Sequence, residues 1–214
     1  MPIELVIFDS DGVLVDSEPV ANRELAALLT ECGLPVSAEQ AMQWFIGHAM
    51  PDVLGIAEQK LGRRLPPDFL DRLQIRTETA FRHELRPVTG VEHLIARLNV
   101  PYCVASNGPI AKMRATLGAT GLLPRFEGRL FSADHVKHPK PAPDLFLHAS
   151  ATMRADPTNC VVVEDGVFGV RAAIAAGMRA IGYAERTDST ALTLAGATVC
   201  MAMAEVETLI RAWQ

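Results

Sequence analysis

The sequence of 214 residues predicts an α/β protein: a doubly wound parallel sheet that carries one inserted, all-helical domain. Two observations lead to this fold class. Short apolar runs rich in β-branched residues recur along the chain without polar alternation, which is typical of parallel strands buried on both faces. Helical patterns lie between these runs, and strands that alternate with helices indicate βαβ units.

Six segments have the strand pattern, and each is shorter than an ordinary helix. The first, residues 4–8, reads ELVIF and stops at Asp9. The others are 102–106, 129–132, 160–164, 180–183 and the less regular 197–201. Helical patterns cover 90–98, 109–121, 141–153, 166–178 and the amphipathic 204–214. Gly177 is the expected left-handed residue at the end of the fourth of these helices.

Between the first and second strands the alternation is replaced by helices alone. Their patterns cover 18–33, 37–47, 51–62 and 66–85. Ser37 is the expected N-cap of the second, and Gly33 and Gly62 are expected to end the first and third. We therefore assign residues 1–16 and 87–214 to the sheet domain and 17–86 to a helical cap. An insertion directly after the first strand is expected over the carboxyl edge of the sheet, where open α/β sheets bind their ligands.

Composition excludes several classes of protein. The net charge of −5 argues against a nucleic-acid-binding domain, which usually carries a basic face. The four cysteines form no CxxC pair, which argues against a zinc ribbon and is typical of a reducing, cytoplasmic compartment. The N-terminus lacks the pattern of a signal peptide, and no apolar stretch is long enough for a membrane helix.

Polar residues follow three of the predicted strands directly: Asp9 and Asp11; Ser106, Asn107 and Gly108; and Glu164 and Asp165. Because the carboxyl ends of parallel strands share one edge, these side chains are expected to meet in one crevice. Four carboxylates at close range repel one another unless a cation lies among them. Oxygen ligands suit a hard divalent ion, so we expect Mg²⁺.

This group of residues is suited to phosphoryl transfer. A carboxylate neutralised by a metal can attack phosphorus, and a second carboxyl can protonate the leaving oxygen and later deprotonate water. The developing charge on the phosphoryl oxygens needs cationic and hydrogen-bonding partners. Ser106 can supply a hydroxyl group and Lys140 a positive charge, and the prolines on either side of Lys140 restrict its loop.

Four segments together resemble the motifs of the haloacid dehalogenase-like hydrolase superfamily, in the subgroup with a helical cap after the first strand. They read DSDGVLVDS, VASNG, KPAPDLF and VVVEDGVFGVRAAIAAGM, in the order of the family. Each lies on the strand or loop where its chemistry requires it, which makes the set far more specific than any one motif. The resemblance covers nearly the whole chain and implies a Rossmann-like catalytic core.

The resemblance also implies a role for each acid and for the lysine. Asp9 would be the nucleophile that forms an aspartyl-phosphate. Asp11 would be the general acid and base, with its backbone carbonyl on Mg²⁺. Lys140 would neutralise the phosphate and the nucleophile. Asp165 would bind Mg²⁺, with Glu164 as a direct or water-mediated ligand.

The substrate contacts come from the same resemblance. Ser106 and the backbone of Asn107 would hold the phosphoryl oxygens, and Gly108 belongs to the same substrate-binding segment. His48 is a candidate substrate contact in the cap, with a surface loop residue as the alternative. Gly166 stands where the family often has serine, which removes one hydrogen bond near the metal.

Each of these features also has an interpretation as a structural residue without a catalytic role. Asp9 and Asp11 can be turn residues, and Ser-Asn-Gly is a common loop tripeptide. Lys140 can be an exposed loop lysine, and Glu164 can be a structural partner of Lys140 or of a helix N-terminus. The presence of all four motifs in order favours the catalytic interpretation over these structural ones.

The expected function is hydrolysis of a small phosphorylated metabolite by a monomer, without nucleic acid or membrane partners. An acid at Asp11 favours phosphoryl transfer over dehalogenation, because halide leaves without a proton. β-Phosphoglucomutases have a cap histidine and arginine where this chain has Ala21 and Met50, which favours water as the acceptor. The stretch CVASNGPIAKM resembles bacterial 6-phosphogluconate and sugar phosphatases. A phosphomutase, a phosphoglycolate phosphatase and a non-enzymatic phosphate sensor are the alternatives.

Overall fold

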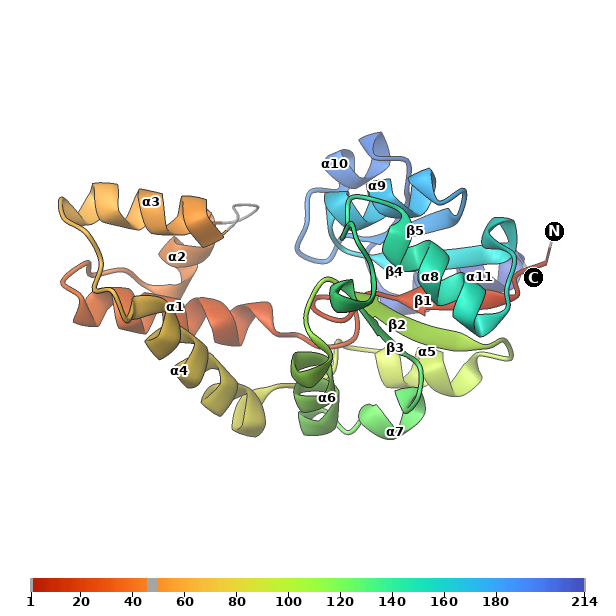
Figure 1. The fold of residues 1–214 in the computed structure, drawn as a ribbon, viewed down its shortest axis with the longest axis horizontal. Coiled ribbons are helices and arrows are strands. Elements are labelled where there is room, and N and C mark those ends of the chain that lie inside the picture. Colours follow the sequence, from red (N-terminus) through yellow and green to blue (C-terminus); the bar gives the residue numbers. More distant parts are fainter. Residues whose placement is uncertain (1, 46–49, 214) are drawn as a thin grey trace. The chain divides into compact units, whose positions relative to one another are not determined.

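The structure is a computed structural model that describes residues 2–45 and 50–213. The chain forms two compact units (Figure 1). Met1–Asp16 and Arg86–Gln214 form one, called the core unit below. Ser17–Leu85 forms the other, called the helical unit. This boundary differs by one residue from the expected one, because Arg86 belongs to the core unit, where its carbonyl accepts a hydrogen bond from the backbone N–H of Asp16.

The core unit contains a six-stranded parallel sheet, which confirms the predicted fold class. Its strands are β1 (Leu5–Phe8), β2 (Tyr102–Ser106), β3 (Leu130–Ser132), β4 (Cys160–Glu164), β5 (Arg179–Tyr183) and β6 (Thr198–Cys200). They are arranged in the order β3-β2-β1-β4-β5-β6. The order reverses direction at β1, as in doubly wound sheets, so the end of β1 is the expected place for a ligand.

The register places Asp9 in the middle of this edge. Phe8, the last residue of β1, pairs with Val104 of β2 and with Val163 of β4. The backbone N–H of Asp9 then donates to the carbonyl of Val163 over 2.9 Å. β2 and β4 each continue to a polar residue, Ser106 and Glu164, at the same edge.

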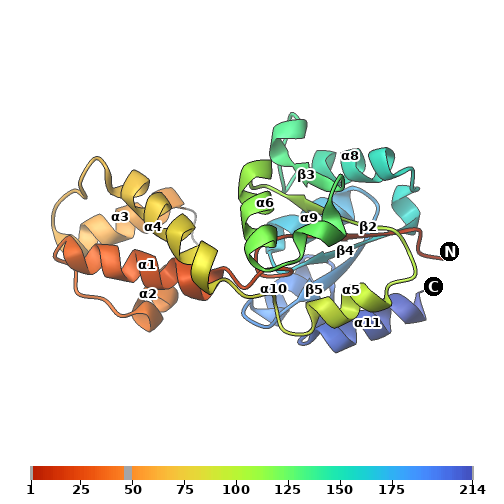
Figure 2. The same cartoon turned by 90° about the horizontal axis from the view of Figure 1, so that it is seen from below.

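Helices cover both faces of the sheet. They are α5 (Val91–Arg97), α6 (Ile110–Ala119), α7 (Leu123–Phe126), α8 (Asp144–Met153), α9 (Val167–Ala175), α10 (Ser189–Leu194) and α11 (Met203–Ala212), with short 3₁₀ turns η1 (Ala133–His135) and η2 (Pro157–Asn159). Figure 2 shows α5 and α11 side by side, across the sheet from α8.

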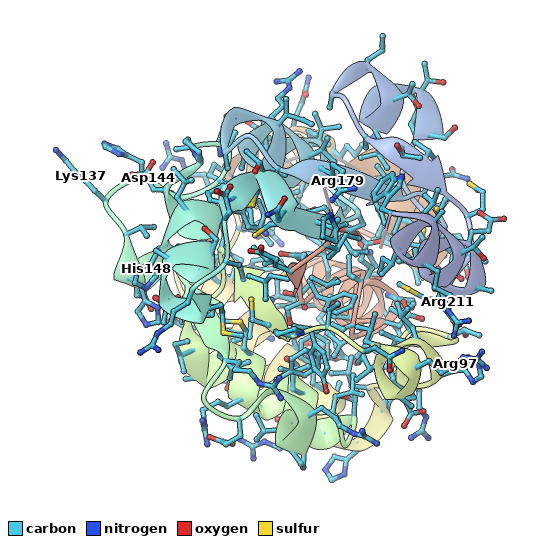
Figure 3. The ribbon with its side chains drawn as sticks, turned by 90° about the vertical axis from the view of Figure 1, so that its right-hand side faces the viewer. Arg97, Lys137, Asp144, His148, Arg179 and Arg211 are labelled. Atoms are coloured by element: carbon cyan, nitrogen blue, oxygen red, sulfur yellow. The ribbon has the colours of Figure 1, made fainter. Side chains whose placement is uncertain are left out.

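Successive side chains of β1 point to opposite faces of the sheet, so they contribute to two core layers, one on each face. Leu5 and Ile7 belong to a buried cluster with apolar residues of α8, α9 and α10. Phe8 instead packs edge-on against Phe126 of α7, with ring centroids 6.3 Å apart. At the outer side of the second layer, Arg97 and Arg211 lie close together (Figure 3), because both contact Glu207.

The two segments that connect the units run beside each other within the core unit. Val15 forms an antiparallel bridge with Pro87, and the N–H of Val88 donates to the carbonyl of Leu14. The N–H of Asp16 donates to the carbonyl of Arg86 over 2.9 Å. This pairing holds the loop that follows Asp9.

The helical unit consists of α1 (Glu18–Glu31), α2 (Ala38–Phe45), α3 (Met50–Leu61) and α4 (Phe69–Glu84). Its buried cluster includes Leu28, Leu29 and Ala41, so it has an apolar core of its own. Ser37 accepts a hydrogen bond from the N–H of Gln40, whose side chain bonds back to Ser37, which confirms the expected cap. Among the described residues, the helices are too short or too polar to cross a bilayer.

Candidate active site

A buried ion-pair group lies at the carboxyl edge of the sheet. Lys140 is 7% exposed, and its Nζ lies 2.6 Å from Oδ1 of Asp9 and 2.8 Å from Oε1 of Glu164. The interpretation of Lys140 as an exposed loop residue is therefore wrong. Three segments distant in the sequence meet here: the end of β1, the end of β4 and the loop before α8.

Burial and charge act against each other in this group. Burial raises the pKa of the Asp9 carboxyl, the Lys140 charge opposes that shift, and the pKa lies at about 7. Burial alone would lower the pKa of Lys140, but the charges of Asp9 and Glu164 outweigh it and raise that pKa. The ammonium therefore stays charged at neutral pH and stabilises the buried carboxylate form of Asp9.

Asn107 holds the loop that delivers Lys140. Its Oδ1 accepts from the backbone N–H of Lys140 over 3.0 Å, and its Nδ2 donates to the backbone carbonyl of Lys140 over 3.2 Å. The Nζ of Lys140 also lies 4.8 Å from the ring centroid of Phe146. The side chain of Asn107 thus fixes the backbone of Lys140. The predicted phosphoryl contact of Asn107 concerns its backbone and is separate from this role.

Glu164 is fixed at both of its oxygens. Oε1 accepts from Lys140, and Oε2 accepts from the backbone N–H of Gly166 over 2.7 Å, directly before α9. The Glu164 carboxylate also occupies space that a side chain at Gly169 would need: a Cβ there would lie 1.7 Å from Oε1. Glu164 is therefore the partner of both Lys140 and a helix N-terminus, as one of the structural alternatives predicts.

The loop after β1 contains Asp11 and Gly12, and it lies against Asp165, which follows β4. Gly12 has a φ of +77°, and a Cβ on it would lie 2.0 Å from Oδ2 of Asp165. Only glycine combines this left-handed backbone with space for the neighbouring carboxylate. Asp11 accepts a 2.7 Å hydrogen bond at Oδ2 from Lys112 of α6.

The segment after β2 forms a compact turn. The Oγ of Ser106 accepts from the N–H of Gly108 over 3.2 Å, and Ser106 is buried. The Oγ of Ser132, at the end of β3, donates to the carbonyl of Gly108 over 2.9 Å. The hydroxyl of Ser106 thus stands in a rigid turn at the same edge of the sheet.

Other predicted site residues belong to the helical unit. His48 lies outside the described residues. Ala21 is on α1, and Met50, the first residue of α3, is exposed.

A divalent cation fits the donor chemistry at the strand ends. In residues 2–45 and 50–213, no three His, Cys, Asp or Glu side chains are close enough to hold a metal by themselves. Mg²⁺ usually takes one or two carboxylates together with water and substrate phosphate. Asp9, Asp165 and the carbonyl of Asp11 supply such a set of hard oxygens. The four carboxyl groups at this edge also outnumber its two ammonium groups, Lys140 and Lys112, by two charges.

Sequence reasoning missed three residues of this site. Gly169 lies within the fourth motif, and its spacing of five from Glu164 gave no signal for a contact. Lys112 lies in the stretch CVASNGPIAKM, four residues after Gly108. One helical turn returns the chain to the same side, so this spacing could have indicated that Lys112 lies near the site. Ser132 ends a strand, as Ser106 does, and this rule would have found it.

Known proteins of similar sequence place this chain in a family. The family model described as haloacid dehalogenase-like hydrolase matches residues 3–177. The 6-phosphogluconate phosphatase of Escherichia coli is 34% identical over 178 residues, which cover 82% of this chain and 80% of that protein. The fructose-1-phosphate phosphatase of the same organism is 32% identical over 194 residues, which cover 82% of this chain and 94% of that one.

A solved structure extends the likeness to the whole fold. The hydrolase of this family from Deinococcus radiodurans, solved with bound phosphate and sodium, superimposes with a TM-score of 0.87. It is 30% identical, and the match covers 99% of this chain and 96% of that one.

The close approach at Gly169 predicts an effect on stability. Alanine in place of a helical glycine normally adds about 0.5–1 kcal/mol to the free energy of unfolding. Gly169→Ala is instead expected to lower it by about 1–3 kcal/mol, because the new methyl group displaces Glu164 from Lys140 and Gly166. Urea unfolding followed by the fluorescence of Trp213, in a Trp44→Phe background, measures the core unit alone.

Gly118→Ala is the matched control for this measurement. Gly118 lies near the end of α6 in the same unit, and its Cβ would meet only Leu123 at an ordinary 3.9 Å. This variant is expected to be as stable as the parent protein or more so. Equal stabilisation by both alanines would show that Glu164 is not held against α9.

Proposed function

This chain belongs to the haloacid dehalogenase-like hydrolase family, and we propose that it is a phosphatase that hydrolyses a small phosphorylated metabolite. The buried pair of Asp9 and Lys140, 2.6 Å apart, is the observation that carries the proposal. A charged lysine beside a buried carboxyl group favours its ionised form and provides positive charge where an anionic substrate must approach it.

Asp9 is the proposed nucleophile. One of its carboxylate oxygens forms a bond to phosphorus while the bond from phosphorus to the leaving oxygen breaks. Asp11, on the same loop, gives its proton to the leaving oxygen, and the dephosphorylated alcohol departs. The product of this half-reaction is an aspartyl-phosphate, an acyl phosphate on Asp9.

Water completes the cycle. Asp11, now a carboxylate, takes a proton from a water molecule whose oxygen attacks phosphorus. The bond between phosphorus and Asp9 breaks, inorganic phosphate leaves, and Asp9 and Asp11 return to their starting states. Lys140 and the hydroxyl of Ser106 stabilise the charge on the phosphoryl oxygens in both halves.

A divalent cation, Mg²⁺ by preference, is part of the proposal. The carboxylates of Asp9 and Asp165 and the carbonyl of Asp11 would hold it. Glu164 is already bonded at both oxygens to protein donors, which favours a water-mediated contact over direct ligation. When bound, the cation neutralises charge on the phosphoryl group and on the nucleophile.

A sugar phosphate or sugar-acid phosphate is the proposed substrate. The two curated relatives described above are named for 6-phosphogluconate and fructose 1-phosphate, and the chain spans most of each. Within the helical unit, Ala21 and Met50 are apolar, whereas the mutase pattern requires histidine and arginine there. These two positions favour hydrolysis over return of the phosphoryl group to a second hydroxyl.

The products of the reaction test this proposal. Purified protein with Mg²⁺ is expected to release inorganic phosphate from 6-phosphogluconate or hexose phosphates, in amounts equal to the substrate consumed. Phosphoglycolate and a polyol phosphate complete the panel. Interconversion of sugar phosphate isomers without phosphate release would replace hydrolysis by a mutase reaction, and no turnover of any compound would favour a phosphate sensor.

Substitution of the nucleophile gives a second test. Asp9→Asn is expected to lower kcat for p-nitrophenyl phosphate by about 10³-fold or more, because no carboxylate remains to attack phosphorus. Asp156→Asn is the control, since this residue caps η2 before the amino end of β4 and asparagine can cap equally well. Unchanged turnover by Asp9→Asn would mean that another group is the nucleophile.

Removal of divalent cations gives a third test. Dialysis against EDTA is expected to abolish phosphate release, and Mg²⁺ should restore it while K⁺ should not. The Asp165→Asn variant should need a higher Mg²⁺ concentration for half-maximal activity, because it loses one anionic ligand. Full activity in EDTA would contradict the assignment of a metal to these residues.

A further inference from the structure

An ion pair at the site has no role in the mechanism above. Nζ of Lys112, on the first turn of α6, lies 2.7 Å from Oδ2 of Asp11. Both side chains are partly exposed, at 44% for Lys112 and 31% for Asp11. This contact joins the segment after β2 to the loop after β1, two segments a hundred residues apart in the chain.

We propose that Lys112 is a positioning residue for Asp11, the proposed general acid and base. The inference rests on the proposed function. By bonding Oδ2, the ammonium restricts the rotation of the Asp11 carboxyl group about its side-chain torsions. A proton donor must lie within hydrogen-bond reach of the leaving oxygen to be effective, so its orientation enters the rate directly.

The position of Lys112 is itself well defined. Its helix begins directly after the turn in which Gly108 bonds to Ser106 and Ser132. Its backbone carbonyl accepts from the hydroxyl of Thr116 over 3.0 Å. Residues 107–112 therefore hold two groups of the candidate site. Asn107 holds the backbone of Lys140, and Lys112 holds the carboxylate of Asp11.

A second ion pair on the same helix serves as a comparison. Arg114, two residues after Lys112, bonds to Glu127 over 2.8 Å, and both side chains are about half exposed. Neither touches a residue of the candidate site in the described part of the chain. Exposed ion pairs of this kind contribute little to stability. Substitution of Arg114 therefore measures the general effect of removing a positive charge from α6, against which the effect of losing the Lys112–Asp11 contact can be compared.

Leaving-group dependence tests the inference. Lys112→Met is expected to lower kcat/KM for a sugar phosphate by about 10–100-fold, because a sugar alkoxide must be protonated as it leaves. The same variant should retain kcat/KM for p-nitrophenyl phosphate within about threefold, since the far more acidic nitrophenol leaves without a well-placed acid. Lys112→Arg, which keeps the charge and hydrogen-bond donors, should restore most of the sugar phosphate activity.

The controls distinguish failure of the inference from failure of the proposed function. Arg114→Met is expected to leave both activities unchanged. If the parent protein hydrolyses neither substrate, the proposed function fails. If the parent is active but Lys112→Met is unaffected, or loses both activities by the same factor with unchanged thermal stability, the positioning role is overturned.

Discussion

The ion pair between Lys140 and the two carboxylates of Asp9 and Glu164 is the interaction on which the rest of the site depends. A single buried charge would be very costly, and a single buried pair is often no better than apolar packing. Here the charges are supported by further hydrogen bonds: Asn107 fixes the lysine backbone, and Gly166 donates to Glu164. The arrangement places a preorganised positive charge beside Asp9, the proposed nucleophile.

Two glycines make this arrangement possible through the side chains they lack. At Gly169 the surface of α9 approaches the carboxylate of Glu164, and at Gly12 the loop after β1 leaves room for Asp165. Both positions lie in the motifs that identify the family. The structure gives a steric reason for them: each glycine marks a place where a carboxylate lies against the backbone.

Much of this molecule follows from its sequence, for identifiable reasons. Apolar, β-branched runs such as 160–164, too short for ordinary helices, predict strands buried on both faces, and the parallel sheet then places Asp9 and Glu164 at one edge. The helix after β4 ends at Ala175, and Gly177 follows with a φ of +74°, which confirms it as the expected left-handed residue past the helix end. The helix after β2 ends at Ala119, two residues before the end of its pattern, because periodicity does not mark where capping begins. Asn107 contacts Lys140 across 33 residues of sequence, and a pattern along the chain carries no information on such a pair. Gly169 lies five residues from Glu164, and their close approach depends on how the turn after β4 leads into α9.

The paired segments at the root of the helical unit have a consequence for how such proteins diversify. Because Asp16 and Arg86 are bonded to each other through their backbones, the chain leaves the core unit and re-enters it at neighbouring points. A module of any length whose two ends lie close together can be accommodated there without moving a strand, a condition under which domain insertions are generally tolerated. The helical unit can thus be replaced during evolution, while the sheet and the residues at its carboxyl edge stay unchanged.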